Sequence, residues 1–203
     1  MVTDGRRPDL LRDGTAGRSN VVPIAGDVTC PGHRAELRAA VLAQSDRLDL
    51  LVNNASKLGP SPQPHLAGYP LEVLRDVYEV NVLAPLALLA HLTPLLTAAG
   101  GVVVNISSDA AVEPYPGWGG YGSAKAALDQ LSRIYAAENP EIRTYAIDPG
   151  DMATELHQQA FPGEDISDRP APETVVPALL RLLDERPPSG RYRAGEPSEP
   201  AAR

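Results

Sequence analysis

The amino-acid sequence predicts a single α/β domain in which helices cover both faces of a parallel β-sheet. Short runs of branched apolar residues alternate along the chain with longer segments whose apolar residues recur at helical spacing. This alternation is typical of strand, helix, strand units. A length of 203 residues with 43% hydrophobic residues also suits one hydrophobic core.

The first clear unit lies between residues 21 and 52. Val21–Ile24 and Leu48–Val52 are short apolar runs of the kind found in strands that are buried on both faces. Between them, His33–Ala43 carries apolar residues at helical spacing, and Pro31 stands just ahead of that segment. We therefore expect a strand, a helix and a second strand.

The rest of the sheet is predicted from the same alternation. Four further elements follow in the order helix, strand, helix, strand. They are a long, kinked helix over Leu71–Leu96, a strand over Val102–Ile106, a helix over Tyr121–Ala137 and a strand over Arg143–Ile147.

Two segments rich in proline and glycine, Gly59–Pro70 and Phe161–Pro172, each follow an expected strand end. Open parallel sheets bind ligands at that edge, so either segment lines a pocket or is a plain surface loop. From Pro187 onward the chain turns polar and proline-rich, with Tyr192 as its last aromatic residue. We expect a domain over 1–186 and a frayed tail over 187–203.

Charge and hydropathy exclude several classes of partner. A net charge of −8 and a pI near 5.0 argue against binding to nucleic acid or to an anionic membrane. The longest apolar stretch, Val82–Leu96, is interrupted by Pro85, His91 and Pro94, so we expect no membrane span. Met1–Arg18 is polar and mixed in charge, unlike a signal peptide, and we expect a cytoplasmic protein.

Metal and hydrolase sites are not indicated. Cys30 is the only cysteine, which excludes an internal disulfide and a cysteine metal cluster. The histidines His33, His65, His91 and His157 are widely spaced, so we expect no metal site. A G-x-S-x-G elbow is missing, which argues against a serine hydrolase.

The clearest chemical signal is the trio Ser108, Tyr121 and Lys125. The chain has only two lysines, and one of them stands four residues after Tyr121, on the same face of an expected helix. A neighbouring ammonium lowers the proton affinity of a phenol, whose ordinary pKa is about 10. Ser108 follows an expected strand, and a segment rich in glycine and proline can fold back to bring it to the tyrosine. A helix cap and a solvated helix face are the alternative interpretations.

The residues around this trio resemble the short-chain dehydrogenase/reductase family, from about Asp27 to the end of the chain. The matching motifs occur in the family's order. They are Asp27 with Val28, Asn53–Ser56 with serine in place of the last glycine of Asn-Asn-Ala-Gly, Asn81, Asn105–Ser108, Tyr121 to Lys125, and Pro149 with Gly150 and Thr154.

The resemblance implies a Rossmann-like doubly wound fold and hydride transfer between a nicotinamide and a carbonyl or alcohol carbon. It implies that Tyr121 exchanges the substrate proton, Ser108 binds the substrate oxygen, and Lys125 lowers the pKa of the tyrosine and holds the ribose. Asn81 would hold a water that relays protons. Pro85 has no N–H, so the carbonyl of Asn81 loses its helical partner and is free to bind such a water. A simple proline kink is the alternative.

The resemblance also implies a cofactor site and its preference. NADP(H) is favoured because basic residues follow the first strand, although Asp4 leaves NAD(H) possible. Met152 and Trp118 are expected to shape a pocket for a small-molecule carbonyl or alcohol, and subunits of a homo-oligomer are expected to pack through helices near 83–96 and 126–137. The expected cofactor-binding residues are Arg6, Asp27, Val28, Asn53, Asn54, Ala55, Tyr121, Lys125, Pro149, Gly150, Met152 and Thr154.

The resemblance fails at the start of the chain, which opens at the equivalent of the family's second strand, Val2–Asp4. About 30 residues, the size of one βα unit with its glycine-rich turn, have no counterpart. Their strand would lie inside the sheet, so we expect either unpaired backbone groups there or a forced pairing of its two neighbours. An interaction module with impaired cofactor binding is therefore the alternative to an active oxidoreductase.

Overall fold

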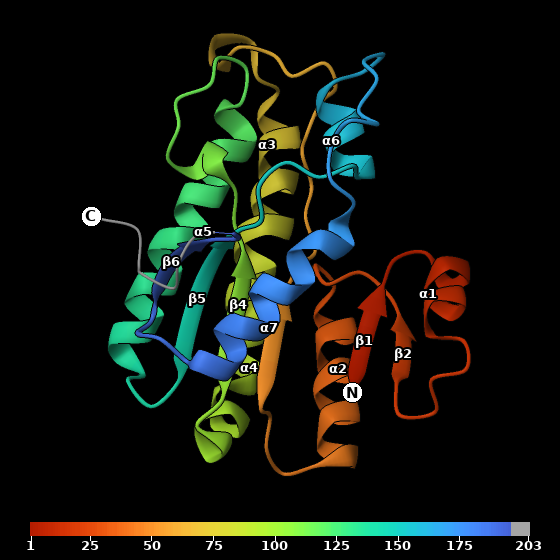
Figure 1. Ribbon diagram of the computed structural model, residues 1–203, viewed down its shortest axis with the longest axis vertical. Coiled ribbons are helices and arrows are strands. Elements are labelled where there is room, and N and C mark those ends of the chain that lie inside the picture. The colour runs from red at the N-terminus through yellow and green to blue at the C-terminus, as the bar shows by residue number, and fades with distance from the viewer. Residues whose placement is uncertain (196–203) are drawn as a thin grey trace.

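A computed structural model describes residues 1–195 of the chain (Figure 1). A π-helical turn over Glu79–Leu83 and three short 3-10 turns lie between some of the elements. In chain order the elements are β1 (Val2–Gly5), α1 (Pro8–Thr15), β2 (Val22–Ala25), α2 (Pro31–Gln44), β3 (Leu50–Asn53), α3 (Leu71–Tyr78), α4 (Ala84–Ala99), β4 (Val102–Ile106), α5 (Gly119–Glu138), β5 (Arg143–Asp148), α6 (Glu155–Ala160), α7 (Val176–Glu185) and β6 (Gly190–Arg193).

The strands are all parallel, but they form two sheets. One has the order β3-β4-β5-β6 and the other consists of β1 and β2. The expected α/β fold is thus confirmed, and helices lie between the strands along the chain. Strands β1 and β3 do not pair with each other, so the first of the two expected outcomes, unpaired edges inside the molecule, is the one observed.

A shared helical layer joins the two sheets. Val2 and Ile24 from the smaller sheet pack against the same apolar cluster as Leu51 from β3 and Val103 from β4. Leucines of α2 and α4 supply most of this cluster, and Leu96 at its centre is fully buried. Side-chain burial on one face therefore holds the two sheets together where backbone hydrogen bonds do not.

The long helix expected over Leu71–Leu96 is present as α3, a π-helical turn and α4 in succession. The irregularity falls at Glu79–Leu83, just before Pro85, which cannot donate a backbone hydrogen bond. By length and composition the whole segment Leu71–Ala99 could cross a membrane, with a mean hydropathy of 1.8, yet 44% of its most apolar window is buried inside the fold. Buried core helices have the same composition.

The tail expected over 187–203 is wrong for the residues up to 195. Gly190–Arg193 forms β6, which pairs with β5 at the edge of the larger sheet. Tyr192 is 3% exposed, packs edge-on against Tyr145 with ring centroids 5.6 Å apart, and donates a hydrogen bond to the carbonyl of Pro188. Residues 196–203, the remainder of the expected tail, lie outside the described residues.

Replacing Tyr192 with Ala tests whether β6 is part of the core. We expect the free energy of unfolding to fall by about 3 kcal/mol, because a large buried ring is lost. Urea denaturation measures this change. The matched control is Tyr115→Ala, at a residue that is 44% exposed, for which we expect a loss below about 1 kcal/mol. Equal losses in the two variants would contradict a structural β6.

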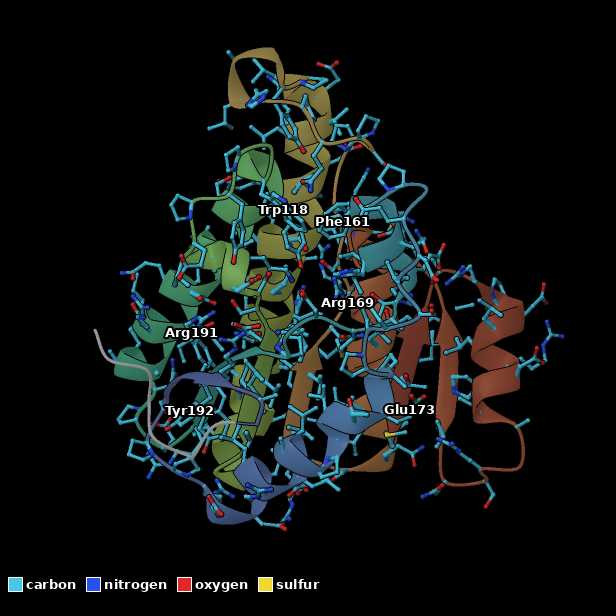
Figure 2. The ribbon with its side chains drawn as sticks, turned by 45° about the horizontal axis from the view of Figure 1, so that its top comes forward. Trp118, Phe161, Arg169, Glu173, Arg191 and Tyr192 are labelled. Atoms are coloured by element: carbon cyan, nitrogen blue, oxygen red, sulfur yellow. The ribbon has the colours of Figure 1, made fainter. Side chains whose placement is uncertain are left out.

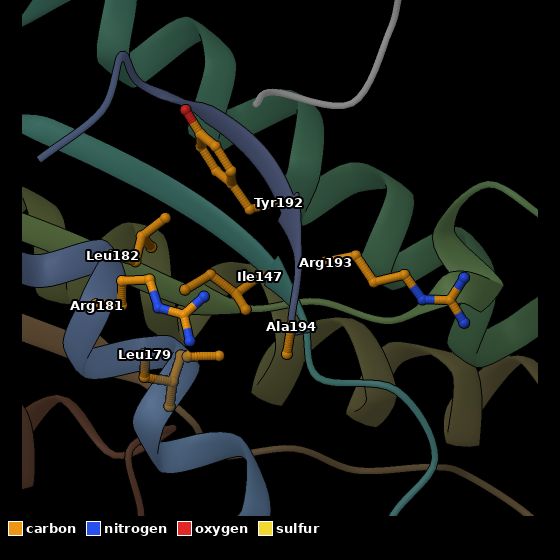
Figure 3. A pocket seen from close by; sticks show the side chains of 8 residues that line it. Ile147, Leu179, Arg181, Leu182, Tyr192, Arg193 and Ala194 are labelled. Atoms are coloured by element: carbon orange, nitrogen blue, oxygen red, sulfur yellow. The ribbon is translucent and has the colours of Figure 1, made fainter. Parts of the chain in front are cut away.

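Helix α7, which the sequence analysis did not identify, covers the outer face of the larger sheet. Leu182 from this helix packs with Tyr145, Ile147 and Tyr192. Figure 3 shows a hollow of about 20 Å³ between α7 and the end of β6, room for about one water. The hollow is lined by Ile147, Ala178, Leu179, Arg181, Leu182, Tyr192, Arg193 and Ala194.

Candidate active site

Strand ends place the candidate residues along one edge of the larger sheet. Strands β3, β4 and β5 are parallel and in register, with Asn53 opposite Asn105 and Ile106 opposite Ile147. Their carboxyl ends therefore meet at one edge, and Asn53, Ser108 and Asp148 stand at or just beyond it. This is the edge at which open α/β sheets bind ligands.

A close approach of α5 to the turn after β4 brings Ser108 and Tyr121 together. Gly122, on α5, lies so near this turn that a Cβ atom would be 2.5 Å from the backbone oxygen of Ala110. Any side chain there would push the helix away from the turn. The sequence analysis attributed this approach to the flexible segment 114–120, and Gly122 is the residue that permits it.

Tyr121 is 6% exposed. Burial raises its pKa to about 12, because an ionised phenolate would lose its hydration, and hydrogen bonds with the hydroxyls of Ser56 and Ser108 oppose the rise. The sequence analysis expects Lys125 to lower this pKa. The pKa of Tyr121 is instead raised, because the cost of burying the phenolate charge is larger than the effect of the hydrogen bonds with Ser56 and Ser108.

Lys125 is 2% exposed, and its ammonium lies 5.4 Å from the centre of the Tyr121 ring. Its Nζ donates a hydrogen bond of 2.8 Å to the carbonyl of Ile106. Burial lowers the pKa of Lys125 to about 8, and the negative charge of Asp129 opposes this change. The side chain thus lies beside the tyrosine and out of bulk solvent, as the expected chemistry requires.

Ser108 has a local structural role as well as its place near the tyrosine. Its hydroxyl donates to a carboxylate oxygen of Asp109 at 3.0 Å and accepts from the backbone N–H of Ala110 at 3.2 Å, so it caps a short 3-10 turn. Ser108 thus has the capping role given above as an alternative interpretation. The capped turn also holds its hydroxyl beside Tyr121.

Asn81 is fully buried in the π-helical turn. Its Nδ2 donates to the carbonyls of Val77 and Lys57, and its Oδ1 accepts a hydrogen bond of 2.7 Å from the hydroxyl of Ser56. The amide of Asn81 thus binds the segment that follows β3. Through Ser56 it is connected to Tyr121.

Ser56 is a site residue that the sequence analysis missed. It stands where the family's turn has its last glycine, and it was noted only as a departure from that motif. Its hydroxyl lies between the Asn81 amide and the Tyr121 phenol. The signal in the sequence was a serine, with a hydroxyl group, at a position where the motif has a glycine without a side chain.

Replacing Ser56 with Ala should raise the pKa of Tyr121 further, because a hydrogen bond that stabilises the phenolate is lost. Tyrosinate absorbance as a function of pH measures this, with Tyr121→Phe subtracted to isolate one phenol. Ser123→Ala is the control, since that hydroxyl donates to the carbonyl of Gly120. An unchanged titration in Ser56→Ala would contradict the contact.

The expected cofactor residues after β3 divide into two groups. Asn53 is buried, and its Nδ2 donates a hydrogen bond of 2.7 Å to the Oδ1 of Asn105, which in turn donates to Ser132. This side chain braces neighbouring strands, while its own Oδ1 has no hydrogen-bond partner in the described part of the chain. Asn54 and Ala55, in contrast, are exposed at the sheet edge.

The expected residues after β5 form a turn that leads into α6. Gly150 has a φ of +73°, and its N–H donates to a carboxylate oxygen of Asp148 at 3.0 Å. Pro149 and Met152 are half-buried in the same turn. The hydroxyl of Thr154 accepts a hydrogen bond from the N–H of His157, so it caps α6.

Arg6, Asp27 and Val28 lie apart from the other site residues, at the carboxyl ends of the smaller sheet. Asp27 accepts hydrogen bonds from the backbone and hydroxyl of Thr29; these, with the charge of Arg6, lower its pKa despite partial burial. Arg6 is exposed and Val28 is buried. The structure thus brings the catalytic candidates together and leaves these three on the far side of the interruption between β1 and β3.

The Oδ2 of Asp4 lies 3.1 Å from the Nε2 of His33, within hydrogen-bond distance. Since His33 is buried on α2, this contact turns the carboxylate toward the helix. Arg7 reaches Glu155 of α6 at 2.8 Å. That exposed pair connects the end of β1 to the segment that follows β5.

Of the two segments that were expected to line a pocket or lie on the surface, Gly59–Pro70 contacts α6, and Phe161, at the start of the second, packs beside Trp118. The hydroxyl of Ser61 donates a hydrogen bond of 2.7 Å to the carbonyl of Gln159. Trp118 lies between Tyr121 and Phe161, with ring centroids 6.0 Å from each, and Figure 2 shows Trp118 and Phe161 next to each other. An apolar aromatic wall therefore stands beside the phenol.

Known proteins are similar to this chain in sequence. A family model described as short chain dehydrogenase matches residues 9–165. A sepiapterin reductase from Xenopus laevis is 31% identical over 167 residues, which cover 80% of this chain and 60% of the frog protein. The short chain dehydrogenase asqE from Emericella nidulans is 38% identical over 120 residues, 58% of this chain and 44% of the fungal one. The chain thus spans less than two thirds of the length of these relatives.

Solved structures agree with the sequence relatives. An oxidoreductase from Escherichia coli, yciK, has a TM-score of 0.87 at 26% identity, covering 96% of this chain and 84% of its own. A short chain dehydrogenase from Escherichia coli CFT073, solved with NADPH, has a TM-score of 0.86 at 28% identity, with 96% and 85% covered.

Proposed function

The chain belongs to the short-chain dehydrogenase family, and from this premise we propose that it is an NAD(P)(H)-dependent oxidoreductase that interconverts a carbonyl and an alcohol. One observation supports this most directly. A buried phenol has a buried ammonium beside its ring and two serine hydroxyls that lower its pKa. Such a group can exchange a proton with a substrate oxygen.

The residues at the sheet edge fit the nicotinamide half of the cofactor. Lys125 supplies a buried ammonium for a ribose, and Gly150 leaves open space beside its Cα because no atom lies within 4 Å of where a Cβ would stand. Pro149, Met152 and Thr154 complete this side. When bound, the cofactor supplies the hydride.

The pyrophosphate half has less support. Family members bind it at a glycine-rich turn that leads into a helix. In the part of the chain that the structure describes, the place for such a strand and turn, between β1 and β3, has no strand. We therefore propose that this form of the chain binds the dinucleotide weakly.

In the proposed reaction Tyr121 donates its phenolic proton to the oxygen of a substrate carbonyl as that oxygen becomes an alcohol. Ser108, whose hydroxyl donates to Asp109 in the structure, would turn its proton to the same oxygen and so stabilise the developing negative charge. A tyrosine pKa of about 12 keeps the phenol protonated at neutral pH, which favours reduction over oxidation. Trp118 and Phe161 exclude water from this step.

After each proton transfer the phenol must recover its proton. Ser56 connects the phenol to Asn81, since the serine hydroxyl is hydrogen-bonded to Tyr121 and donates to the Oδ1 of Asn81. The ammonium of Lys125 stabilises the transient phenolate electrostatically. Its own pKa of about 8 also allows it to exchange protons near neutral pH.

We propose NADP(H) as the preferred cofactor. Arg6 is exposed beside Asp27 at the end of the smaller sheet, where a guanidinium can bind a 2′-phosphate. Asp4, the acidic residue that would favour NAD(H), is paired with His33. The NADPH in the Escherichia coli neighbour agrees with this choice.

Titration with NADPH and NADH, followed by fluorescence, tests the proposal. We expect saturable NADPH binding that Arg6→Ala weakens about tenfold, with NADH binding little changed, because only the 2′-phosphate contact is lost. Arg12→Ala, which removes an exposed guanidinium paired with Asp9, is the matched control. Absence of saturable NADPH binding by the chain would refute the enzyme proposal for this form. Ketones for the activity assay should include sepiapterin, given the frog relative's name.

A second candidate is an interaction module with little dinucleotide binding. The open edges of β1 and β3 favour it, since each presents backbone N–H and C=O groups without a strand partner. The titration separates this candidate from the enzyme.

We also propose that copies of the chain associate through exposed Leu83, Leu86 and Ile134, which light scattering would detect.

A further inference from the structure

We infer that Arg191, on β6, is a positioning residue for the proposed reaction, because its guanidinium holds together the strand ends that carry Ser108 and Asp148. This inference rests on the proposed function. It concerns a residue in the stretch expected to be a tail, for which the sequence patterns suggested no role. Figure 2 shows Arg191 on the side of the molecule formed by α5 and β6.

The contacts of Arg191 join three elements. Its Nη2 donates a hydrogen bond of 2.9 Å to the backbone carbonyl of Ser108, just after β4. The same nitrogen lies 3.3 Å from the Oδ2 of Asp148, the last residue of β5. Its Nε donates at 3.1 Å to the Oδ2 of Asp129, on α5. One planar group thus fixes two strand ends against the catalytic helix.

All three charged side chains are buried. The side chain of Arg191 is 10% exposed, and those of Asp129 and Asp148 are 5% and 3% exposed. Two carboxylates in so little solvent require a cation, and the guanidinium supplies it. Arg191 is the nearer cation to Asp148, at 3.3 Å against 3.9 Å for Arg193, and it also contacts Asp129 at 3.1 Å.

The contacts lead directly to groups of the candidate active site. Asp148 accepts the N–H of Gly150 through its other oxygen, so its position sets the turn after β5. Asp129 lies one helical turn after Lys125 and acts on its charge. Arg191 therefore contacts Ser108 itself, and it is connected to the Gly150 turn through Asp148 and to the ammonium of Lys125 through Asp129.

A cavity of about 110 Å³ lies beside this cluster, lined in part by Ser132, Thr144 and Arg191. The hydroxyl of Thr144 faces no hydrogen-bond partner within the described residues, although the residue is 1% exposed. Water can enter a polar space of this size. A smaller polar side chain at position 191 should therefore be solvated without collapse of the fold.

The first test is Arg191→Lys, which keeps the charge and loses the fork geometry. With NADPH and a reducible ketone, we expect kcat to fall at least tenfold while KM for NADPH changes less than twofold, because misplacement affects the reacting groups. Arg193→Lys, on the same strand but 52% exposed and 3.9 Å from Asp148, is the matched control. A kcat for Arg191→Lys within twofold of the natural chain would overturn the inference.

The second test separates positioning from stability. In Arg191→Gln with Asp129→Asn, one buried carboxylate is neutralised with the guanidinium, so the melting temperature should recover relative to Arg191→Gln alone. The carbonyl of Ser108 still lacks its donor, so kcat should stay low. Recovery of kcat together with stability would show a structural role only and would overturn the inference.

Hydrogen exchange of the cofactor-free protein gives a readout that does not need activity. In the double variant we expect the amides of Ala110 and Gly150 to exchange at least tenfold faster, while those around Leu96 in α4 are unchanged. Unchanged exchange at Ala110 and Gly150 would overturn the inference. If the natural chain neither binds NADPH nor turns over, the proposed function fails, and exchange alone decides whether Arg191 positions these strand ends.

Discussion

Replacing Tyr121 with Phe is expected to lower kcat for carbonyl reduction by about a thousandfold, the range over which positioned proton donors contribute. The ring stays in its cluster with Leu58 and Ala110, so folding should be preserved. Only the proton donor is removed, and KM for NADPH should change less than threefold. Steady-state kinetics with a reactive ketone measure both quantities.

Tyr135→Phe is the matched control for this variant. Tyr135 is also partly buried on α5, and its hydroxyl lies 2.9 Å from the Thr93 hydroxyl, away from the sheet edge. We expect its kcat to equal that of the natural chain. If Tyr121→Phe retained more than a tenth of the activity, another group would have to supply the proton.

The second large effect concerns pH and stability. Burial lowers the pKa of Lys125 from an ordinary 10.5 to about 8. Between these two values the unfolded chain binds more protons than the folded one, so stability should rise with pH. From pH 7 to pH 9, below the range in which tyrosines titrate, this group should add about 1 kcal/mol to the free energy of unfolding.

Replacing Lys125 with Met should remove that rise and leave a stability that varies little over the same pH range. Urea denaturation at a series of pH values measures it. Lys57→Met is the matched control, because Lys57 is the other lysine of the chain and pairs with Asp76 at the surface. A rise of equal size in Lys125→Met and the natural chain would mean that other groups cause it.

Sequence patterns predicted strands β2 to β5 and the long helix, and they singled out Ser108, Tyr121 and Lys125 for reasons that are local. Spacing of four residues places Tyr121 and Lys125 on one helix face regardless of tertiary contacts. Apolar runs such as Val102–Ile106 identify central strands because these are buried on both faces. The position of Ser108 at the sheet edge could be predicted because it comes just after such a run.

Strand β6, the raised pKa of Tyr121 and the role of Ser56 depend on tertiary contacts, which a local sequence pattern does not show. Strand β6 reads Gly-Arg-Tyr-Arg, and the side chain of Arg191 is shielded from solvent only because β5, Asp129 and Asp148 surround it. The raised pKa of Tyr121 follows from desolvation by distant segments, which outweighs the hydrogen bonds of Ser56 and Ser108. Ser56 gains its role from Asn81, 25 residues later in the chain.

The interruption between β1 and β3 also bears on how the protein behaves at high concentration. The outer strand β2 carries Pro23, which lacks an N–H and discourages a further strand from pairing. Neither β1 nor β3 contains a proline or a lysine, and Leu50 and Val52 of β3 are exposed. Edges of this composition recruit strands from other molecules. Self-association into aggregates should therefore begin within the molecule's own sheet, at the β1 and β3 edges, and not at its outer rim.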